Sequence, residues 1–127
     1  MHELQSNAYI ALAQYYVDRL HQMLSVWNQQ SPKETNTVEK MLFLQKNLLA
    51  CAANSGDKRF FEDMLKDSLQ LAEKLQLDNA SWNKGVEANL IKLGKNNFIP
   101  LSALKENFGE NSKLYKDFLT AYSLFYD

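Results

Sequence analysis

Apolar residues recur every three or four positions along most of this chain, the spacing that places them on one side of an α-helix. At the start of the chain the pattern predicts one long helix, from about Glu3 to Gln29. Its apolar positions are Leu4, Ala8, Leu12, Tyr16, Leu20, Met23 and Trp27, with Tyr9 and Leu24 widening the stripe. No stretch alternates polar and apolar residues with β-branched enrichment, so we expect an all-α fold without a sheet.

The second helix is the most apolar segment of the chain. From Val38 to Ala53 it is dense in Leu, Met, Phe and Ala, which leaves little of its surface polar. We therefore expect it to be the central, most buried helix. Its start has two candidate caps, one in the segment 31–34 with Pro32 at the first helical position, and one in the segment 36–39.

A short polar break, Asn-Ser-Gly-Asp at 54–57, separates this helix from a third that runs to about Leu77. Gly56 suits the left-handed conformation that often follows a helix end, because glycine adopts a positive φ without a steric penalty. Asp57 can accept a hydrogen bond from the first turn of the next helix. The pattern thus predicts a helical hairpin with its corner at these four residues.

A fourth helix is expected to start within residues 78–81 and to end at Gly94. Gly85 lies inside it and costs roughly 1 kcal/mol of helix stability relative to alanine. A glycine at such a position predicts either a close contact with its backbone or a frayed start to the helix.

Two shorter helices follow. Residues 101–108 make a short helix ended by Gly109, and the last helix runs from Lys113 to about Phe125, capped by Asn111 or Ser112. Short connections throughout favour an antiparallel, up-and-down bundle of about five to six helices in one domain, residues 1–127. The alternative is a short helical-repeat-like array, because the segment 50–72 resembles a repeat unit of the tetratricopeptide type.

Composition excludes several classes of protein. Of the 127 residues, 46% are apolar and 23% are charged, which is ordinary globular usage, and the formal charge of −1 provides no overall positive field for a nucleic acid. Cys51 is the only cysteine, so neither an intrachain disulfide nor a zinc site with several thiolates is possible. No uncharged apolar run approaches the ~20 residues that span a bilayer. We expect a soluble, cytoplasmic protein.

Catalytic and metal-binding patterns are nearly absent. Asp18 and His21 share one helical face and can provide two metal ligands, but the further inward-facing glutamates of a di-iron bundle are missing. The apolar neighbours of Cys51 predict a raised pKa and an inert thiol. We therefore predict no enzyme activity, no catalytic residue, no cofactor and no metal.

Aromatic residues are concentrated on the first and last helices. Because the aromatic stripes are wide and lie at the chain ends, we predict that they bind another protein or a second copy of this chain in a homodimer. The candidate partner-binding residues are Tyr9, Tyr15, Tyr16, Trp27, Tyr115, Tyr122, Phe125 and Tyr126. Within the last helix, core packing is favoured for Phe118, Leu119 and Tyr122. The leading hypothesis is a non-enzymatic helical interaction domain of adaptor or regulatory type.

Two alternatives belong to other functional classes. Residues 101–120 fit part of a helix-turn-helix template for DNA binding, with the turn at Gly109. However, the reading helix carries Asp117 beside Lys113 and Lys116, so its charge is nearly balanced and nucleic acid is not the favoured partner. The other alternative is a bundle whose aromatic-lined cavity holds a small apolar ligand.

Overall fold

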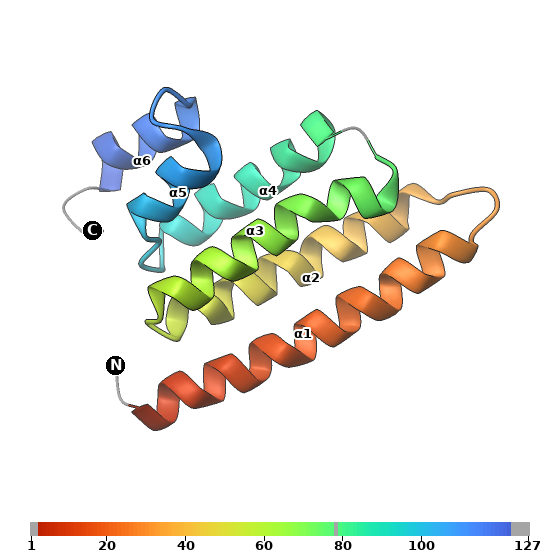
Figure 1. Cartoon of the computed structure of the whole chain (residues 1–127), viewed down its shortest axis with the longest axis horizontal. Coiled ribbons are helices and arrows are strands. Elements are labelled where there is room, and N and C mark those ends of the chain that lie inside the picture. Colours follow the sequence, from red (N-terminus) through yellow and green to blue (C-terminus); the bar gives the residue numbers. More distant parts are fainter. Residues whose placement is uncertain (1–2, 78, 123–127) are drawn as a thin grey trace.

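The computed structural model describes the backbone of residues 3–77 and 79–122 and the side chains of residues 5–77 and 80–121 (Figure 1). Six helices make up most of this described part, and none of its residues lies in a strand. The helices are α1 (Glu3–Gln29), α2 (Thr35–Asn54), α3 (Lys58–Leu75), α4 (Asn79–Gly94), α5 (Leu101–Phe108) and α6 (Lys113–Tyr122). The predicted all-α bundle of five to six helices is confirmed.

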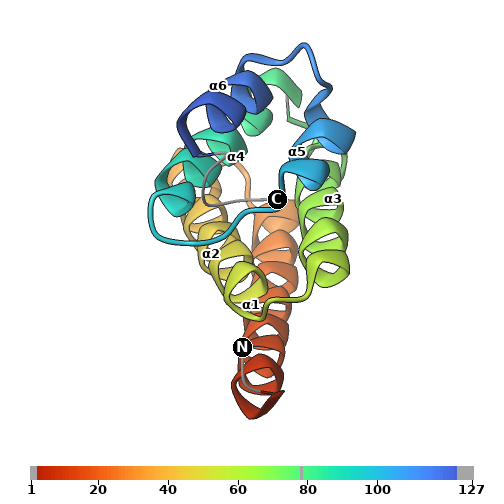
Figure 2. The same ribbon diagram turned by 90° about the vertical axis from the view of Figure 1, so that its left-hand side faces the viewer.

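The first four helices run alternately up and down, and α2 lies among the other three (Figure 1). Helix α2 contacts α1, α3 and α4, as expected for the most buried helix. Helix α5 packs on α3, and α6 packs on α4 and α5, so the last two helices form a short pair over one end of the bundle. From the side, the N-terminal end of α1 extends beyond the corner between α2 and α3 (Figure 2).

The corner between α2 and α3 has the local structure that its sequence predicts. Gly56 has a φ of +76°, in the left-handed region that glycine enters without strain. The side chain of Asp57 accepts a hydrogen bond from the Phe60 backbone N–H at 3.0 Å, which caps α3. Both predictions are confirmed, because they depend only on neighbouring residues.

The start of α2 differs from both predicted caps. The helix begins at Thr35, its N-cap Glu34 makes no side-chain cap, and Pro32 precedes the helix. The side-chain oxygen of Gln30 accepts hydrogen bonds from the Glu34 backbone N–H at 3.4 Å and from the Thr37 hydroxyl at 3.1 Å. Neither predicted cap is used, and the Glu34 backbone N–H donates to Gln30 instead.

Both tryptophans are structural members of the core. The indole N–H of Trp27 donates to the Leu75 carbonyl at 3.0 Å, and that of Trp82 donates to the Ser68 carbonyl at 2.8 Å. Leu75 is the last residue of α3, so its carbonyl has no partner within the helix and α1 supplies one. The largest fully buried side chains are Trp82, Phe61, Phe118, Met41, Leu49, Leu65, Leu75, Leu90, Ile99 and Leu104.

Two glycines of α4 lie against neighbouring helices. A Cβ atom at Gly94 would lie 2.5 Å from the ring of Phe118, which is 1% exposed and packs from α6. A Cβ atom at Gly85 would lie 2.9 Å from the terminal methyl groups of Leu42. The predicted close approach at Gly85 is therefore present. The two sites differ because the terminal methyl groups of Leu42 can move aside, whereas the fully packed ring of Phe118 cannot.

Alanine substitution tests this difference. Gly94→Ala forces the Phe118 ring out of its position, so we expect it to lower the free energy of unfolding by about 1–3 kcal/mol. Gly85→Ala gains helix propensity while Leu42 shifts, so we expect a change within about 1 kcal/mol in either direction. Urea denaturation monitored by circular dichroism measures both. Equal losses in the two variants would contradict the assigned contacts.

Candidate functional site

The aromatic residues predicted on α1 have different environments. Tyr15 is 55% exposed, whereas Tyr9 and Tyr16 are partly buried against the core. The rings of Tyr15 and Tyr16 meet edge-to-face, with centroids 5.4 Å apart. Trp27 is only 7% exposed and hydrogen-bonds to α3, so we remove it from the partner-binding residues and assign it to the core.

The predicted aromatic face of the last helix is only partly described. Tyr115 is partly buried and packs against the core. The side chain of Tyr122 and all of Phe125 and Tyr126 lie outside the described residues. Phe118 is buried as expected, but Leu119 is exposed, because one side of α6 faces α4 and α5 and Leu119 lies away from it.

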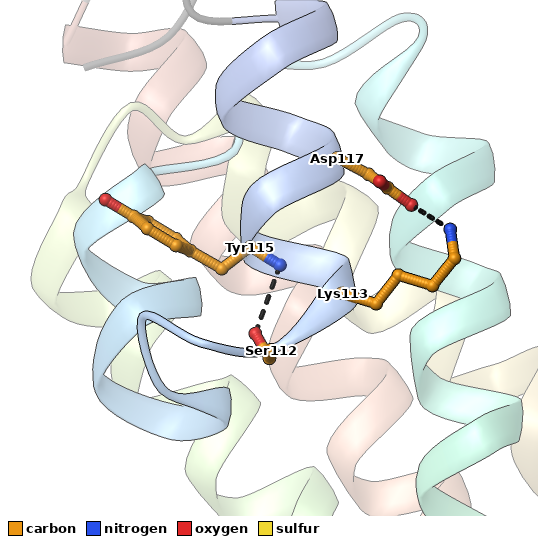
Figure 3. Close-up of polar contacts among 4 residues, drawn as sticks. All are labelled: Ser112, Lys113, Tyr115 and Asp117. Atoms are coloured by element: carbon orange, nitrogen blue, oxygen red, sulfur yellow. Dashed lines mark hydrogen bonds and ion pairs between the residues drawn. The ribbon is translucent and has the colours of Figure 1, made fainter.

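Figure 3 shows how the first turn of α6 is arranged. The Ser112 hydroxyl accepts a hydrogen bond from the Tyr115 backbone N–H at 3.2 Å, so Ser112 is the cap. Lys113 Nζ lies 2.5 Å from Asp117 Oδ2. The Tyr115 ring points away from this ion pair, toward the opposite side of the helix.

The charges of residues 101–120 bear on the DNA-binding alternative. Of the three lysines in this segment, Lys105 lies 3.7 Å from Glu110 and Lys113 pairs with Asp117. Phosphate contacts supply most of the affinity for DNA, and lysines beside carboxylates offer little net charge to phosphates. The helix-turn-helix alternative stays a prediction without support from these charges.

The first and last helices do not form a single surface. Helix α1 packs on α2 and α3, whereas α6 packs on α4 and α5, and the described parts of α1 and α6 are not in contact. In both views of the molecule α2 and α4 lie between them (Figures 1 and 2). The predicted aromatic residues therefore belong to two separate regions.

An open groove of about 360 Å³ lies between α1 and α2. It is lined by Arg19, Met23, Asn36, Glu39, Lys40, Phe43 and Leu44, and we call it the α1–α2 groove. Phe43 is 59% exposed, while Met23 and Leu44 are partly buried and pack against the core. The groove therefore has an apolar floor with polar residues at its edges.

Further exposed apolar side chains lie on the same flank of α1. Positions 12, 15, 19, 23 and 26 follow steps of three and four residues, so they share one side of the helix. Leu12 and Val26 are each 44% exposed. We call the α1–α2 groove together with Leu12, Tyr15 and Val26 the α1–α2 face.

Sequence reasoning identified Tyr15 and missed the other exposed members of this face. Phe43 was expected in a buried helix, yet it lies five residues before the buried Leu48, which turns it about 140° away on a helix of 3.6 residues per turn. An apolar residue so far from the buried stripe was the available signal. Whether another helix covers it depends on the packing of the whole chain.

Two further hollows lie elsewhere. One of about 420 Å³, larger than the α1–α2 groove, lies beside Trp27 and Trp82, with Lys33 and Ser81 among its lining residues. Lys33 donates to the Trp27 carbonyl and its ammonium lies 5.2 Å from the centre of the Trp27 ring. The other hollow, of about 150 Å³, lies between α1 and α3 near His21.

The described residues offer little for catalysis. His21 is exposed, and no group of three or more His, Cys, Asp or Glu side chains in this part of the chain is arranged to hold a metal ion. Burial raises the pKa of the Cys51 thiol, as predicted from its apolar neighbours. Within the described residues, no helix combines the length and the apolar character that crossing a bilayer requires.

The environment of Cys51 has a measurable consequence. Because only the thiolate attacks disulfide reagents, a buried thiol with a raised pKa should react at least about tenfold more slowly with Ellman's reagent at neutral pH than the same thiol in the unfolded chain. The rate in buffer and in concentrated urea provides the comparison. Equal rates would contradict a buried, inert Cys51.

Comparisons with protein-family models, with curated proteins and with solved structures find no match for this chain. Its function is therefore inferred from its own geometry and charges.

Proposed function

We propose that this protein is a non-enzymatic, cytoplasmic interaction domain that binds another protein through the α1–α2 face. The observation that carries the proposal is the concentration of exposed apolar side chains there. Of seven large apolar residues exposed in the described part of the chain, four belong to this face, namely Leu12, Tyr15, Val26 and Phe43. Isolated exposed apolar residues are ordinary, but a grouped set beside a groove is typical of a binding surface.

The make-up of the face also supports a protein partner. Tyrosine, phenylalanine, methionine and arginine are enriched at protein interfaces, and Tyr15, Phe43, Met23 and Arg19 all occur here. The edge-to-face contact between Tyr15 and Tyr16 restricts the exposed ring before binding. A restricted ring loses less conformational entropy on binding, which increases its contribution to affinity.

This proposal relocates the interaction that the sequence suggested. Tyr15 stays at its centre, and Phe43 of α2 takes the place that Trp27 was expected to fill. Tyr115 is partly buried on a separate region of the molecule, so it is not part of this surface. The packing of α2 against α1 then supports the exposed side chains of α1, and α2 forms one wall of the binding site.

Alanine substitutions within the face test the proposal. Tyr15→Ala and Phe43→Ala each remove an exposed ring, so we expect each to weaken partner capture from a native lysate about tenfold, the range of an interface anchor. Ile91→Ala on α4 is the control, because Ile91 is also an exposed apolar residue but lies outside the face. Thermal melting should change little in all three variants.

Two results would contradict this proposal. Light scattering that finds a strict monomer, together with no captured protein, would remove the proposal. Capture that survives both ring deletions, or that Ile91→Ala weakens to the same extent, would place the interaction elsewhere on the molecule. The DNA-binding and small-ligand alternatives would then be tested by titration with duplex DNA at low salt and by native mass spectrometry.

A further inference from the structure

Charge distinguishes the α1–α2 groove from the molecule as a whole. Arg19 and Lys40 line the groove. Lys46 is not a lining residue, but its ammonium lies 5.2 Å from the centre of the ring of Phe43, which is one. Glu39 is the carboxylate among the lining residues. The chain carries a formal charge of −1, so a positively charged groove has the opposite sign to the protein that bears it.

None of these three cations belongs to an ion pair within the described part of the chain. The ion pairs recorded there join Lys66 to Glu106, Lys105 to Glu110 and Lys113 to Asp117, none of which lies at the groove. Arg19 instead donates to the neutral side chain of Gln22 at 3.1 Å. Cations at the rim of an apolar groove favour a partner that brings carboxylates to its own edges.

The shape of the face fits a helix. Residues 12 to 26 of α1 extend over about 21 Å at a rise of 1.5 Å per residue, or about four turns. A groove between two antiparallel helices can bind a third helix. The apolar side chains at every third or fourth position of that helix enter the groove. Met23 on the floor suits this role, because its flexible thioether adapts to the side chains it meets.

We propose that the α1–α2 groove binds an acidic, amphipathic helix of another protein, with its apolar side on Met23, Phe43 and Leu44 and its carboxylates beside Arg19 and Lys40. This inference rests on the proposed function and names the partner's chemistry. A second copy of the chain fits less well, since a symmetric dimer through the same face brings positive groove against positive groove.

Two synthetic peptides of about 18 residues, or five turns, test the charge preference. Both carry leucine at the same three- and four-residue spacing, one with glutamate and the other with lysine at the flanking positions. Fluorescence anisotropy of the labelled peptides should give at least about tenfold tighter binding of the glutamate peptide at low salt, with the preference reduced at high salt. Phe43→Ala should weaken the binding of that peptide.

Charge reversal gives the matched control. Arg19→Glu with Lys40→Glu should reverse the preference toward the lysine peptide. Lys92→Glu with Lys95→Glu changes the net charge equally on exposed positions of α4 and the segment after it, and should leave the preference unchanged. All four positions are exposed, so melting temperatures should stay close to that of the wild type.

Three results would overturn the acidic-helix assignment. The first is equal affinity for both peptides, or no binding of either. The second is binding to vesicles of phosphatidylcholine and phosphatidylserine in place of the glutamate peptide, which would make the face a membrane surface. The third is self-association that Phe43→Ala abolishes. If the peptides fail while native capture still requires Tyr15 and Phe43, the proposed interaction domain stands and only the partner's chemistry is wrong.

Discussion

The burial of α2 on three sides is the constraint on which the rest of this structure depends. Its contacts with α1, α3 and α4 include a polar one, in which the Asn89 side-chain amide donates to Gln45 Oε1 at 2.8 Å and to the Leu42 carbonyl at 3.0 Å. Gln45 is fully buried, and its own Nε2 has no hydrogen-bond partner. Sliding α4 along α2 would leave further buried polar groups unpaired, so this contact specifies how the two helices align.

The position of the candidate site follows from that burial. Helices α3 and α4 occupy the sides of α2 that face the core, so Phe43 and Leu44 border the open groove between α1 and α2. A helix that is apolar all round needs cover on every side, and among the described residues one flank of α2 is left without it. In the same arrangement, Arg19 and Lys40 belong to none of the ion pairs among the described residues, and with Glu39 as the carboxylate of the lining the groove carries a net positive charge.

Helices α5 and α6 contribute more to the packing of the bundle than to a separate binding surface. Phe118 of α6 packs directly over Gly94, and Lys66 of α3 pairs with Glu106 of α5 at 2.8 Å. The hydrogen bond and charge of Glu106 raise the pKa of Lys66, although the pair is exposed and contributes little to stability. Apolar packing, more than ion pairing, therefore attaches α5 and α6 to the first four helices.

The bounds of α1 and of the short α5, the Gly56–Asp57 corner and the raised pKa of Cys51 were predictable from sequence, because spacing, caps and apolar neighbours act within a few residues. Tyr15 was predictable as exposed because the aromatic residues of α1 cannot all point the same way. Tertiary structure alone decided that Trp27 binds the end of α3 and that Phe43 stays exposed. Each of these depends on which helix comes to lie beside a residue, and a periodic pattern does not contain that information.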